Sequence, residues 1–408
     1  MPHSRINPTT GDAEAEVGRI FHEEFGRSVA GLIRLFGDVD IAEDAVQEAF
    51  TVALRKWPVD GFPPNPGGWI MTTARNRAID RWRRESRERE LLVGAAALAP
   101  QDDDLLSLIF TCCHPALSME AQVALALRLL CGLSTRDVAR SFLVEESTMA
   151  QRLVRAKRKI KAARIPYRVP DDDELPDRIR PVLAVIYLVY NAGLTSATDT
   201  GLRFEAIRLA RTVSTLIPGE PEAAGLLALL LLVESRQASR TRADGSLVLL
   251  GEQDRKLWDR ALIREGRALV RACLRRNQPG PYQLQAAIQA VHADATTIEE
   301  TDWPQIVALY DQLYILAPTP VVALNRAIAH GEVRGSAVAL ALVDELKLDN
   351  YHLFHATRAD LLRRLGRHGE AALAYQRAAA LAPTDSEREF LRAGGRGSAT
   401  RTQSEKGR

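Results

Sequence analysis

Two cationic segments contain the residues whose types and spacing are best suited to chemistry with a nucleic acid. In the first, residues 69–84, tryptophans and arginines are interleaved at helical spacing. Guanidinium groups can hold phosphates while an aromatic ring stacks on an unpaired base, and this stacking offsets part of the cost of pulling a base out of a duplex. We interpret Trp69 as a core residue, whereas Trp82, which stands among arginines, is equally suited to packing and to stacking.

The second cationic segment, residues 152–164, contains seven bases and no acid. It belongs to a predicted helix-turn-helix, in which Ser134 and Asp137 have the spacing of a capping box and residues 143–145 form the turn. The predicted buried stripe of the second helix consists of Met149, Leu153, Ala156 and Ile160. Its opposite side carries hydrogen-bonding residues followed by bases, which is what reading a major groove requires. The alternative is a solvated helix face.

A third segment, residues 12–60, contains eleven acids and five bases and is therefore acidic. The spacing of Asp40 and Glu43 is that of another capping box, which predicts that a helix begins there. On that helix, one side carries Glu43, Asp44, Gln47 and Glu48, and another side is apolar. An exposed acidic stripe beside a buried face suits a basic protein partner, and a solvated face is again the alternative.

The composition places these segments in a helical chain with several domains. The chain has 408 residues, of which 46% are apolar and 26% charged, and its net charge is +2. This balance excludes general disorder, and the abundance of Ala, Leu and Arg favours helix over sheet. Four cysteines do not form a disulfide framework, and no apolar run reaches the roughly 18 residues of a membrane span. We therefore expect a soluble, cytoplasmic protein without a signal peptide.

Pro- and Gly-rich stretches and changes of charge divide the chain into predicted domains. We predict an all-α fold with two small helical domains, the second a helix-turn-helix, joined to a C-terminal helical repeat domain. The predicted ranges are 13–90 for the first domain, 91–104 for a linker, 105–165 for the second domain, 166–177 for a hinge, 178–394 for the repeat domain and 395–408 for a disordered tail. A further break is predicted within the first domain, at residues 58–68.

The predicted repeat domain contains one spacing pattern in three copies. The copies are Ala206, Ala210, Val213 and Pro218; Ile306, Tyr310, Leu313 and Pro318; and Ala371, Tyr375, Ala378 and Pro383. This pattern is typical of the second helix of a tetratricopeptide (TPR) unit, in which small residues allow close helix pairing. Stacked units of this kind bury one continuous face. Gly366 supplies the expected turn before the last copy, and an irregular helical bundle is the alternative.

The order of these segments resembles the bacterial sigma-70-type sigma factors of the extracytoplasmic-function (ECF) class. Asp44–Phe50 resembles the helix with which that class binds core RNA polymerase, and Arg75–Arg83 resembles its promoter-melting, −10-reading helix. Leu133–Lys159 is similar to its −35-reading motif. Phe110–Ser118 and the long helical extension resemble a subgroup with a C-terminal TPR-like domain. The resemblance covers about residues 15–390.

The resemblance implies a subunit that directs core RNA polymerase to specific promoters and helps to open the −10 region. The polymerase-binding residues would be Asp44, Gln47, Glu48 and Phe50. The −10 DNA-binding residues would be Phe62, Asn65, Arg75, Asn76, Asp80, Arg81, Trp82, Arg83 and Arg84. The −35 DNA-binding residues would be Ser147, Thr148, Gln151, Arg152, Arg155, Lys157 and Arg158. Regulation in cis by the TPR-like domain, and a small protein partner for it, are also implied.

Two other functions fit parts of the pattern. A helix-turn-helix repressor or activator with a TPR adaptor domain would bind duplex DNA without polymerase, and a pure repeat adaptor would use its basic helices only as surface. The sequence contains no phosphate loop, no zinc-protease helix and no clear nucleophile–base pair, so we expect neither an enzyme nor a cofactor. Cys112, Cys113 and His114 adjoin, but adjacent cysteines cannot easily face one tetrahedral ion, so we predict no metal site.

Overall fold

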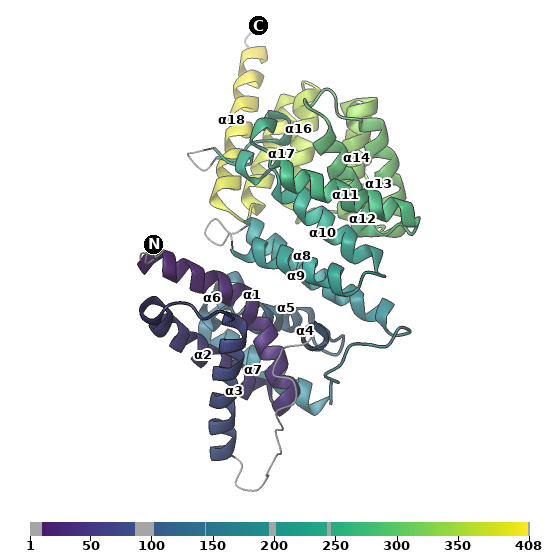
Figure 1. Cartoon of the computed structure of the whole chain (residues 1–408). Coiled ribbons are helices and arrows are strands. Elements are labelled where there is room, and N and C mark those ends of the chain that lie inside the picture. The colour runs from purple at the N-terminus through teal and green to yellow at the C-terminus, as the bar shows by residue number, and fades with distance from the viewer. Residues whose placement is uncertain (1–9, 86–101, 143, 196–200, 243–245, 407–408) are drawn as a thin grey trace, which may run out of the picture. The chain divides into compact units, whose positions relative to one another are not determined.

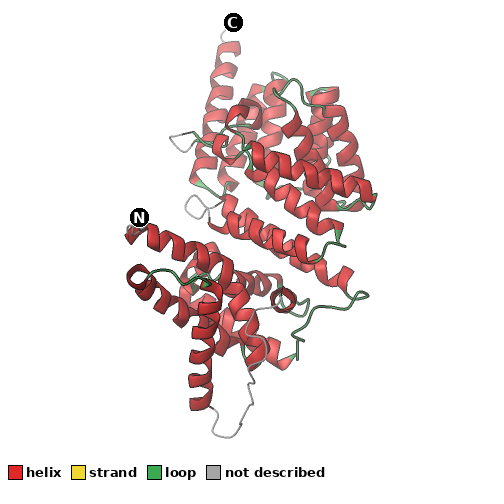
Figure 2. Cartoon of the chain, in the orientation of Figure 1, coloured by secondary structure: helices red, strands yellow, loops and turns green. Residues whose placement is uncertain are grey.

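In the computed structural model, the described residues are 10–85, 102–142, 144–195, 201–242 and 246–406, and every regular element within them is a helix (Figure 2). The all-α prediction is confirmed, since extended pairing in these ranges is limited to one isolated bridge between Thr241 and Leu247. The chain divides into two compact units, residues 1–216 and 217–408. This division lies beyond the predicted hinge at 166–177, because α8, which follows that hinge, packs against α4 and α5 of the first unit.

Within its described residues, the first unit contains the helices α1 to α9 (Figure 1) and a π-helical turn, η1. Their bounds are α1 Thr10–Phe36, α2 Val39–Asp60, α3 Pro66–Glu85, α4 Asp102–Cys112, α5 Met119–Leu125, η1 Ala126–Leu130, α6 Thr135–Ser141, α7 Glu146–Ala162, α8 Leu175–Thr195 and α9 Gly201–Leu216. The predicted linker at 91–104 lies mostly outside the described residues, and its last three residues already belong to α4.

Helix α2 begins and ends at other residues than the sequence predicts. Its N-cap is Asp38, whose carboxylate accepts hydrogen bonds from the backbone N–H groups of Asp40 and Ile41, so the predicted cap at Asp40 is wrong. The cause lies one residue earlier, where Gly37 has a φ of 67° and ends α1, which leaves Asp38 as the first extended residue. At the other end, α2 continues through Pro58 to Asp60, and the predicted break shrinks to residues 61–65.

Apolar side chains hold α1, α2 and η1 together. The ring of Phe21 lies 4.9 Å from that of Phe25 and 4.8 Å from that of Phe50, measured between centroids. The backbones of α1 and η1 also approach closely, since a Cβ atom added at Gly26 would lie 2.8 Å from the carbonyl oxygen of Leu130. Only glycine permits this approach, so Gly26 sets how closely α1 packs on η1.

The predicted helix-turn-helix is confirmed as α6, a turn and α7. The side chain of Ser134 accepts a hydrogen bond from the backbone N–H of Asp137, which caps α6 as the capping-box spacing predicts. In α7 the buried residues are Met149, Leu153, Ala156 and Ile160, the predicted stripe. This stripe fixes the face of α7 that turns outward.

In the part of the second unit that the structure describes, helices follow one another from α10 to α18 (Figure 1), together with short 3-10 turns between α10 and α11. The helices are α10 Pro221–Glu234, α11 Arg260–Arg276, α12 Pro281–Asp294, α13 Trp303–Leu316, α14 Pro320–Arg334, α15 Ser336–Asp344, α16 His352–Arg364, α17 His368–Leu381 and α18 Asp385–Lys406. The turns are η2 Gln237–Ser239, η3 Leu250–Glu252 and η4 Arg255–Leu257. Within the described ranges, no helix combines the length and apolar character that crossing a membrane requires.

The three copies of the predicted repeat pattern fall on α9, α13 and α17. Each of these helices ends two residues before the proline of its copy, and Gly366 has the left-handed φ of 74° that its turn before α17 requires. Helix α18 continues to Lys406 and so extends into the range of the predicted disordered tail at 395–408, whose disorder stays a prediction. In this part of α18, Gly394 lies against the ring of Tyr375, and Gly395 lies beside the Cβ atom of the same residue.

Candidate nucleic-acid interface

Helix α3 presents the arginines of the first cationic segment. Its buried residues Ile70, Met71, Ala74 and Ala78 pack on α2 and α1, which leaves the remaining side of α3 toward solvent. The predicted contact residues are exposed at Asn76, Asp80 and Arg83 and half-buried at Arg75, Arg81 and Trp82. The side chain of Arg84 lies outside the described residues. The half-buried ring of Trp82 is thus next to exposed cations, as stacking on an unpaired base requires.

The loop before α3 has structural roles. The ring of Trp57 is buried, and it lies 5.4 Å from the ring of Phe62 and 5.3 Å from that of Trp69. Asn65 accepts a hydrogen bond from the backbone N–H of Gly68 at 2.9 Å and so caps α3. Trp69 therefore packs on Trp57 but is half-buried, less than its prediction as a core residue implies. Phe62 and Asn65 support the start of α3, and their contact with DNA stays a prediction.

The acidic side of α2 is only partly as predicted. Asp44 and Glu48 are 42% and 55% exposed, and Gln47 is half-buried, so these three can meet a partner. Phe50 is only 3% exposed and packs on Phe21, so it is part of the core here, and its contact with polymerase stays a prediction. Glu43, predicted on the same exposed side, is also 3% exposed. The interface that α2 offers is therefore narrower than the sequence pattern indicates.

Ion pairs join the exposed side of α2 to α3. Arg81 Nη1 lies 2.6 Å from Asp44 Oδ2, and Arg77 Nε lies 3.8 Å from Glu48 Oε2. All four side chains are at least 40% exposed, so each pair contributes at most about 1 kcal/mol to stability. Such weak pairs can exchange their partners when another charged surface binds.

Helix α7 presents most of its predicted DNA-reading residues. Ser147, Thr148, Gln151, Arg155 and Arg158 are exposed, and Arg152 is half-buried. These side chains lie on the face opposite the buried stripe, in the order that a groove-reading helix needs. Lys157 departs from this arrangement, because its side chain is only 16% exposed and is turned toward α2.

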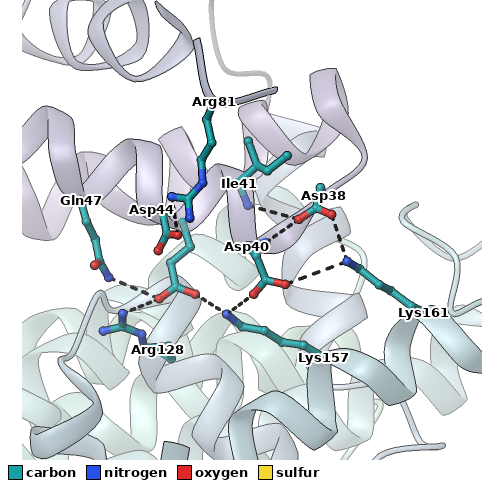
Figure 3. A network of polar contacts seen from close by, with 10 residues as sticks. Asp38, Asp40, Ile41, Asp44, Gln47, Arg81, Arg128, Lys157 and Lys161 are labelled. Atoms are coloured by element: carbon teal, nitrogen blue, oxygen red, sulfur yellow. Dashed lines mark hydrogen bonds and ion pairs between the residues drawn. The ribbon is translucent and has the colours of Figure 1, made fainter. Parts of the chain in front are cut away.

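The side chain of Lys157 reaches a polar network at the N-terminal end of α2 (Figure 3). Lys157 Nζ donates hydrogen bonds to Glu43 Oε2 at 2.6 Å and to Asp40 Oδ1 at 2.8 Å. Arg128 of η1 forms an ion pair with the other carboxylate oxygen of Glu43. Gln47 Nε2 also donates to Glu43 Oε1 at 3.3 Å. The buried carboxylate of Glu43 is therefore satisfied by two cations and one amide.

Lys161, one turn further along α7, completes the network. Its ammonium group lies 2.9 Å from Asp38 Oδ2 and 3.9 Å from Asp40 Oδ2 (Figure 3). Burial alone would raise the pKa of Asp38, but the hydrogen bonds from Lys161 and from the backbone outweigh it and lower that pKa. Burial alone would likewise lower the pKa of Lys157, but Glu43 and Asp40 raise it above its usual value. Both charged forms are thus favoured in the network.

Sequence reasoning missed Arg128 and the buried role of Glu43. The available signal was Arg128 itself, a lone cation within the apolar run at residues 123–131. A cation in such a run is rarely buried without a partner. Its partner could not be named, because helical periodicity carries no information about contacts with a distant segment.

Two further contacts bind α1 to the rest of the first unit. Glu205 of α9 is 4% exposed, and its carboxylate oxygens lie 2.8 Å from His22 Nδ1 and 2.8 Å from Arg208 Nη2. Arg208 also donates to the carbonyl oxygen of Leu130. The hydroxyl of Tyr167 donates to the carbonyl oxygen of Ala30 at 2.8 Å. Thus α9 and the segment after α7 both contact the helices around the network.

The cysteines take no part in this interface. Cys112, Cys113 and Cys131 are buried free thiols, and burial raises the pKa of all three, that of Cys113 to about 12. The thiolate, which is the reactive and metal-binding form, is therefore disfavoured. In the part of the chain that the structure describes, no group of three His, Cys, Asp or Glu side chains is placed to hold a metal ion.

Three segments of the chain match known protein families. Residues 21–88 match sigma-70 region 2, and residues 107–160 match sigma-70 region 4. Residues 178–274 match a family of unknown function, DUF6596. The helices α1 to α3 therefore contain a match to sigma-70 region 2, and α4 to α7 contain a match to sigma-70 region 4; these two parts of the chain are called region 2 and region 4 below.

Two proteins are similar in sequence to this chain, over different shares of its length. An uncharacterized protein of Rhizobium meliloti (strain 1021) is 44% identical over 388 residues, which cover 90% of this chain and 92% of that protein. The probable ECF RNA polymerase sigma factor SigI of Mycobacterium tuberculosis (strain H37Rv) is 31% identical over 146 residues, which cover 32% of this chain and 50% of that protein. The similarity to the Rhizobium protein thus includes most of the C-terminal extension.

Proposed function

We propose that this chain is an ECF-class sigma factor that brings core RNA polymerase to specific promoters in the cytoplasm. The observation that carries the proposal is the presence of two cationic helices, α3 and α7, on two separate sigma-70 regions. One helix offers an aromatic ring among cations, and the other offers polar side chains opposite a buried stripe. This difference between the two helices suits α3 for binding unpaired bases and α7 for reading duplex DNA.

At the −35 element, α7 enters the major groove with its exposed face. Arg152 and Arg155 can each donate two hydrogen bonds to a guanine edge, and Gln151 can pair with an adenine edge. The exposed side chains of Ser147, Thr148 and Arg158 bind phosphates or bases beside them. The hydrogen bond from Arg155 to Gln151, 3.4 Å long and exposed, is weak enough to be exchanged for contacts with bases.

At the −10 element, α3 captures bases that leave the duplex. Trp82 stacks on an extruded base, and Arg83 and Arg75 bind the phosphates of the same strand. Polymerase docks on Asp44, Gln47 and Glu48 of α2, next to α3. Since Asp44 pairs with Arg81, docking on α2 also alters the charge that α3 presents to DNA.

The C-terminal extension regulates this activity in cis. Support comes from α9, whose Glu205 and Arg208 contact His22 of region 2 and the backbone of Leu130 in region 4. The remaining helices, α10 to α18, form a TPR-like unit that binds a small protein partner. The exposed side chains of Ile315 and Leu373, 78% and 66% exposed, offer apolar surface for that partner.

Transcription in vitro with purified core polymerase and fragmented chromosomal DNA of the source organism tests the proposal. We expect a set of transcripts whose 5′ ends are seen only when the full chain is added and which share upstream sequences at −35 and −10. Duplex binding by the chain without any effect on polymerase would instead support the helix-turn-helix repressor or activator. If the chain neither binds duplex DNA nor supports transcription, only the adaptor function remains.

A further inference from the structure

Helix α11 of the second unit exposes a row of cations that lies outside both sigma-70 regions. We propose that this row is a further DNA-binding surface, which holds the phosphate backbone of duplex DNA. The inference goes beyond the proposed function, because it assigns a DNA contact to the C-terminal extension and involves neither α3 nor α7.

The row consists of five arginines, which we call the arginine stripe: Arg260, Arg264, Arg267, Arg271 and Arg275. With about 3.6 residues per turn, these positions fall within roughly a quarter of the helix circumference. The buried residues of α11, which packs on α10 and α12 (Figure 1), lie on another face. Four of the five arginines are exposed, and the side chain of Arg267 is 40% exposed. The stripe is therefore open to a ligand along the length of α11.

Most of the stripe carries charge that no acid neutralises. In the part of the chain that the structure describes, no carboxylate lies within ion-pair distance of Arg264, Arg271 or Arg275. Arg267 Nε lies 2.8 Å from Asp294 Oδ1, but both side chains are at least 40% exposed, so this pair is weak and can be exchanged. A bound anion would thus meet at least three guanidinium groups that need not first leave another partner.

The stripe is unfavourable for the isolated helix. Cations four residues apart on a helix repel each other. The helix contains three such pairs: Arg260 with Arg264, Arg267 with Arg271, and Arg271 with Arg275. The single acid of α11, Glu265, falls outside the stripe and does not separate these cations. A polyanion laid along the stripe would remove this repulsion.

Exposed arginines elsewhere in the second unit are arranged differently. Arg364 Nε lies 2.7 Å from Oδ2 of Asp360, four residues earlier on α16. Arg367 Nη2 likewise lies 2.7 Å from Oε2 of Glu370, three residues later. Pairs of this kind suit a surface that meets only solvent. Because the stripe lacks them, a solvated helix face is not a sufficient explanation for it.

The composition of the stripe favours DNA over an acidic protein. Protein–protein interfaces have a core with apolar and aromatic side chains, whereas protein–DNA interfaces are more polar and much more positively charged. The stripe contains arginines alone, and the exposed large apolar side chain that α11 places beside it is Leu274. The planar guanidinium group also matches the geometry of a phosphate, to which it can donate two parallel hydrogen bonds.

The length of the stripe fits several phosphates of one DNA strand. From Arg260 to Arg275 the helix rises by about 22 Å at 1.5 Å per residue. Phosphates of one strand follow each other at about 3.4 Å along the duplex axis, so this length corresponds to about six of them. Five guanidinium groups can therefore be distributed along one stretch of backbone.

Binding of a 30-base-pair duplex of random sequence to the full chain, measured by fluorescence anisotropy at several salt concentrations, tests this inference. The test variant is R264Q with R271Q and R275Q, because glutamine removes the charge and forms helix about as well as arginine. We expect it to bind about tenfold more weakly than its control near 0.1 M salt. We also expect the slope of log K against log salt to be shallower by about 2 to 3, since three phosphate contacts are lost.

The matched control is R334Q with R377Q and R392Q, which removes the same charge at exposed arginines of three other helices of the second unit. Equal duplex binding by the test variant and the control overturns the inference. A labelled poly-glutamate peptide is the second probe. If it binds more tightly than the duplex at the same salt, and loses this binding in the test variant, the surface belongs to an acidic protein and the inference is again overturned.

Modification of arginines by phenylglyoxal, read by mass spectrometry, gives a measurement that needs no variant. We expect saturating duplex to protect Arg264, Arg271 and Arg275 of the unmodified chain and to leave the reactivity of Arg334 and Arg377 unchanged. Arginines of the stripe that react as fast with DNA as without it contradict the inference.

The same footprint separates this inference from the proposed function. Protection of the arginine stripe, together with failure of the transcription test, would refute the proposed function and leave the DNA contact of α11 standing. Transcripts that depend on the chain, from a chain whose stripe stays unprotected, would refute the DNA contact of α11 and leave the proposed function standing.

Discussion

Arg81 of α3 and Asp44 of α2 form an ion pair in which Nη1 and Oδ2 are 2.6 Å apart. A residue expected to contact DNA thus neutralises a residue expected to contact polymerase. Because both side chains are about 40% exposed, the pair is weak and can exchange partners. We therefore expect polymerase that binds Asp44 to release Arg81 toward the promoter strand, so that the two interfaces of region 2 are coupled.

The −35 assignment predicts the effect of changing two arginines of α7. R152A and R155A should each weaken promoter binding by about 1–3 kcal/mol where the guanidinium contacts a base, and should relax specificity at that base pair. Arg155 is exposed and Arg152 is half-buried, and neither belongs to the buried stripe of α7, so stability should change little. Electrophoretic mobility shifts of the holoenzyme measure the effect, with R334A, an exposed arginine of α14, as the matched control. Equal binding by all three variants would refute the assignment.

The −10 assignment predicts a defect in strand opening. The double variant W82A with R83A loses the stacking ring and one phosphate contact, and base–aromatic stacking is worth about 1–3 kcal/mol per base. We expect weaker permanganate reactivity of unpaired thymines at −10, while formation of the closed complex changes much less. An unchanged permanganate footprint would show that α3 does not capture the strand through these residues.

The buried carboxylate of Glu43 predicts a large loss of stability. E43A leaves the cations Arg128 and Lys157, which are 15% and 16% exposed, without their main partner, and breaking a buried pair in this way costs about 3–5 kcal/mol. Urea denaturation followed by circular dichroism measures the loss. The control E48A removes a carboxylate that is 55% exposed and should change stability by less than about 1 kcal/mol. Similar midpoints for the two variants would contradict the burial of Glu43.

The lowered pKa of Asp38 predicts a stability that depends on pH. A carboxyl group with a lower pKa in the folded chain than its ordinary value of 3.8 stabilises the fold above that value. The contribution is lost as the pH falls through the folded pKa. We expect the melting temperature of the unmodified chain to exceed that of D38N at pH 6, and the difference to shrink below about pH 4. A constant difference across this range would exclude the ionised carboxylate as its source.

Local features of the sequence predicted local features of the structure. The stripe from Met149 to Ile160 is buried, and Ser134 caps α6, because periodicity and capping act over one or two turns. The ends of helices were less predictable where the backbone conformation of a single residue determines them. At Gly37, the left-handed φ moves the cap of α2 from Asp40 to Asp38.

The network could not have been predicted from the sequence in the same way. Glu43 falls on the acidic side of α2 by periodicity, yet Lys157 and Arg128 from region 4 bury it. Such a contact depends on how two separately built regions pack, and the spacing within one helix does not contain that information. Helix α18 is a similar case, since Gly394 and Gly395 lie beside the side chain of Tyr375 in α17, a contact that spacing within α18 does not reveal.

Association of the purified full chain with core RNA polymerase, followed by analytical ultracentrifugation, tests the central claim most directly. We expect a complex of one chain with one core enzyme at micromolar concentration, and clearly weaker association for D44A with E48A than for the matched control D172A with D173A. No association at that concentration, or equal association of both variants, would contradict the claim that α2 docks this chain on polymerase.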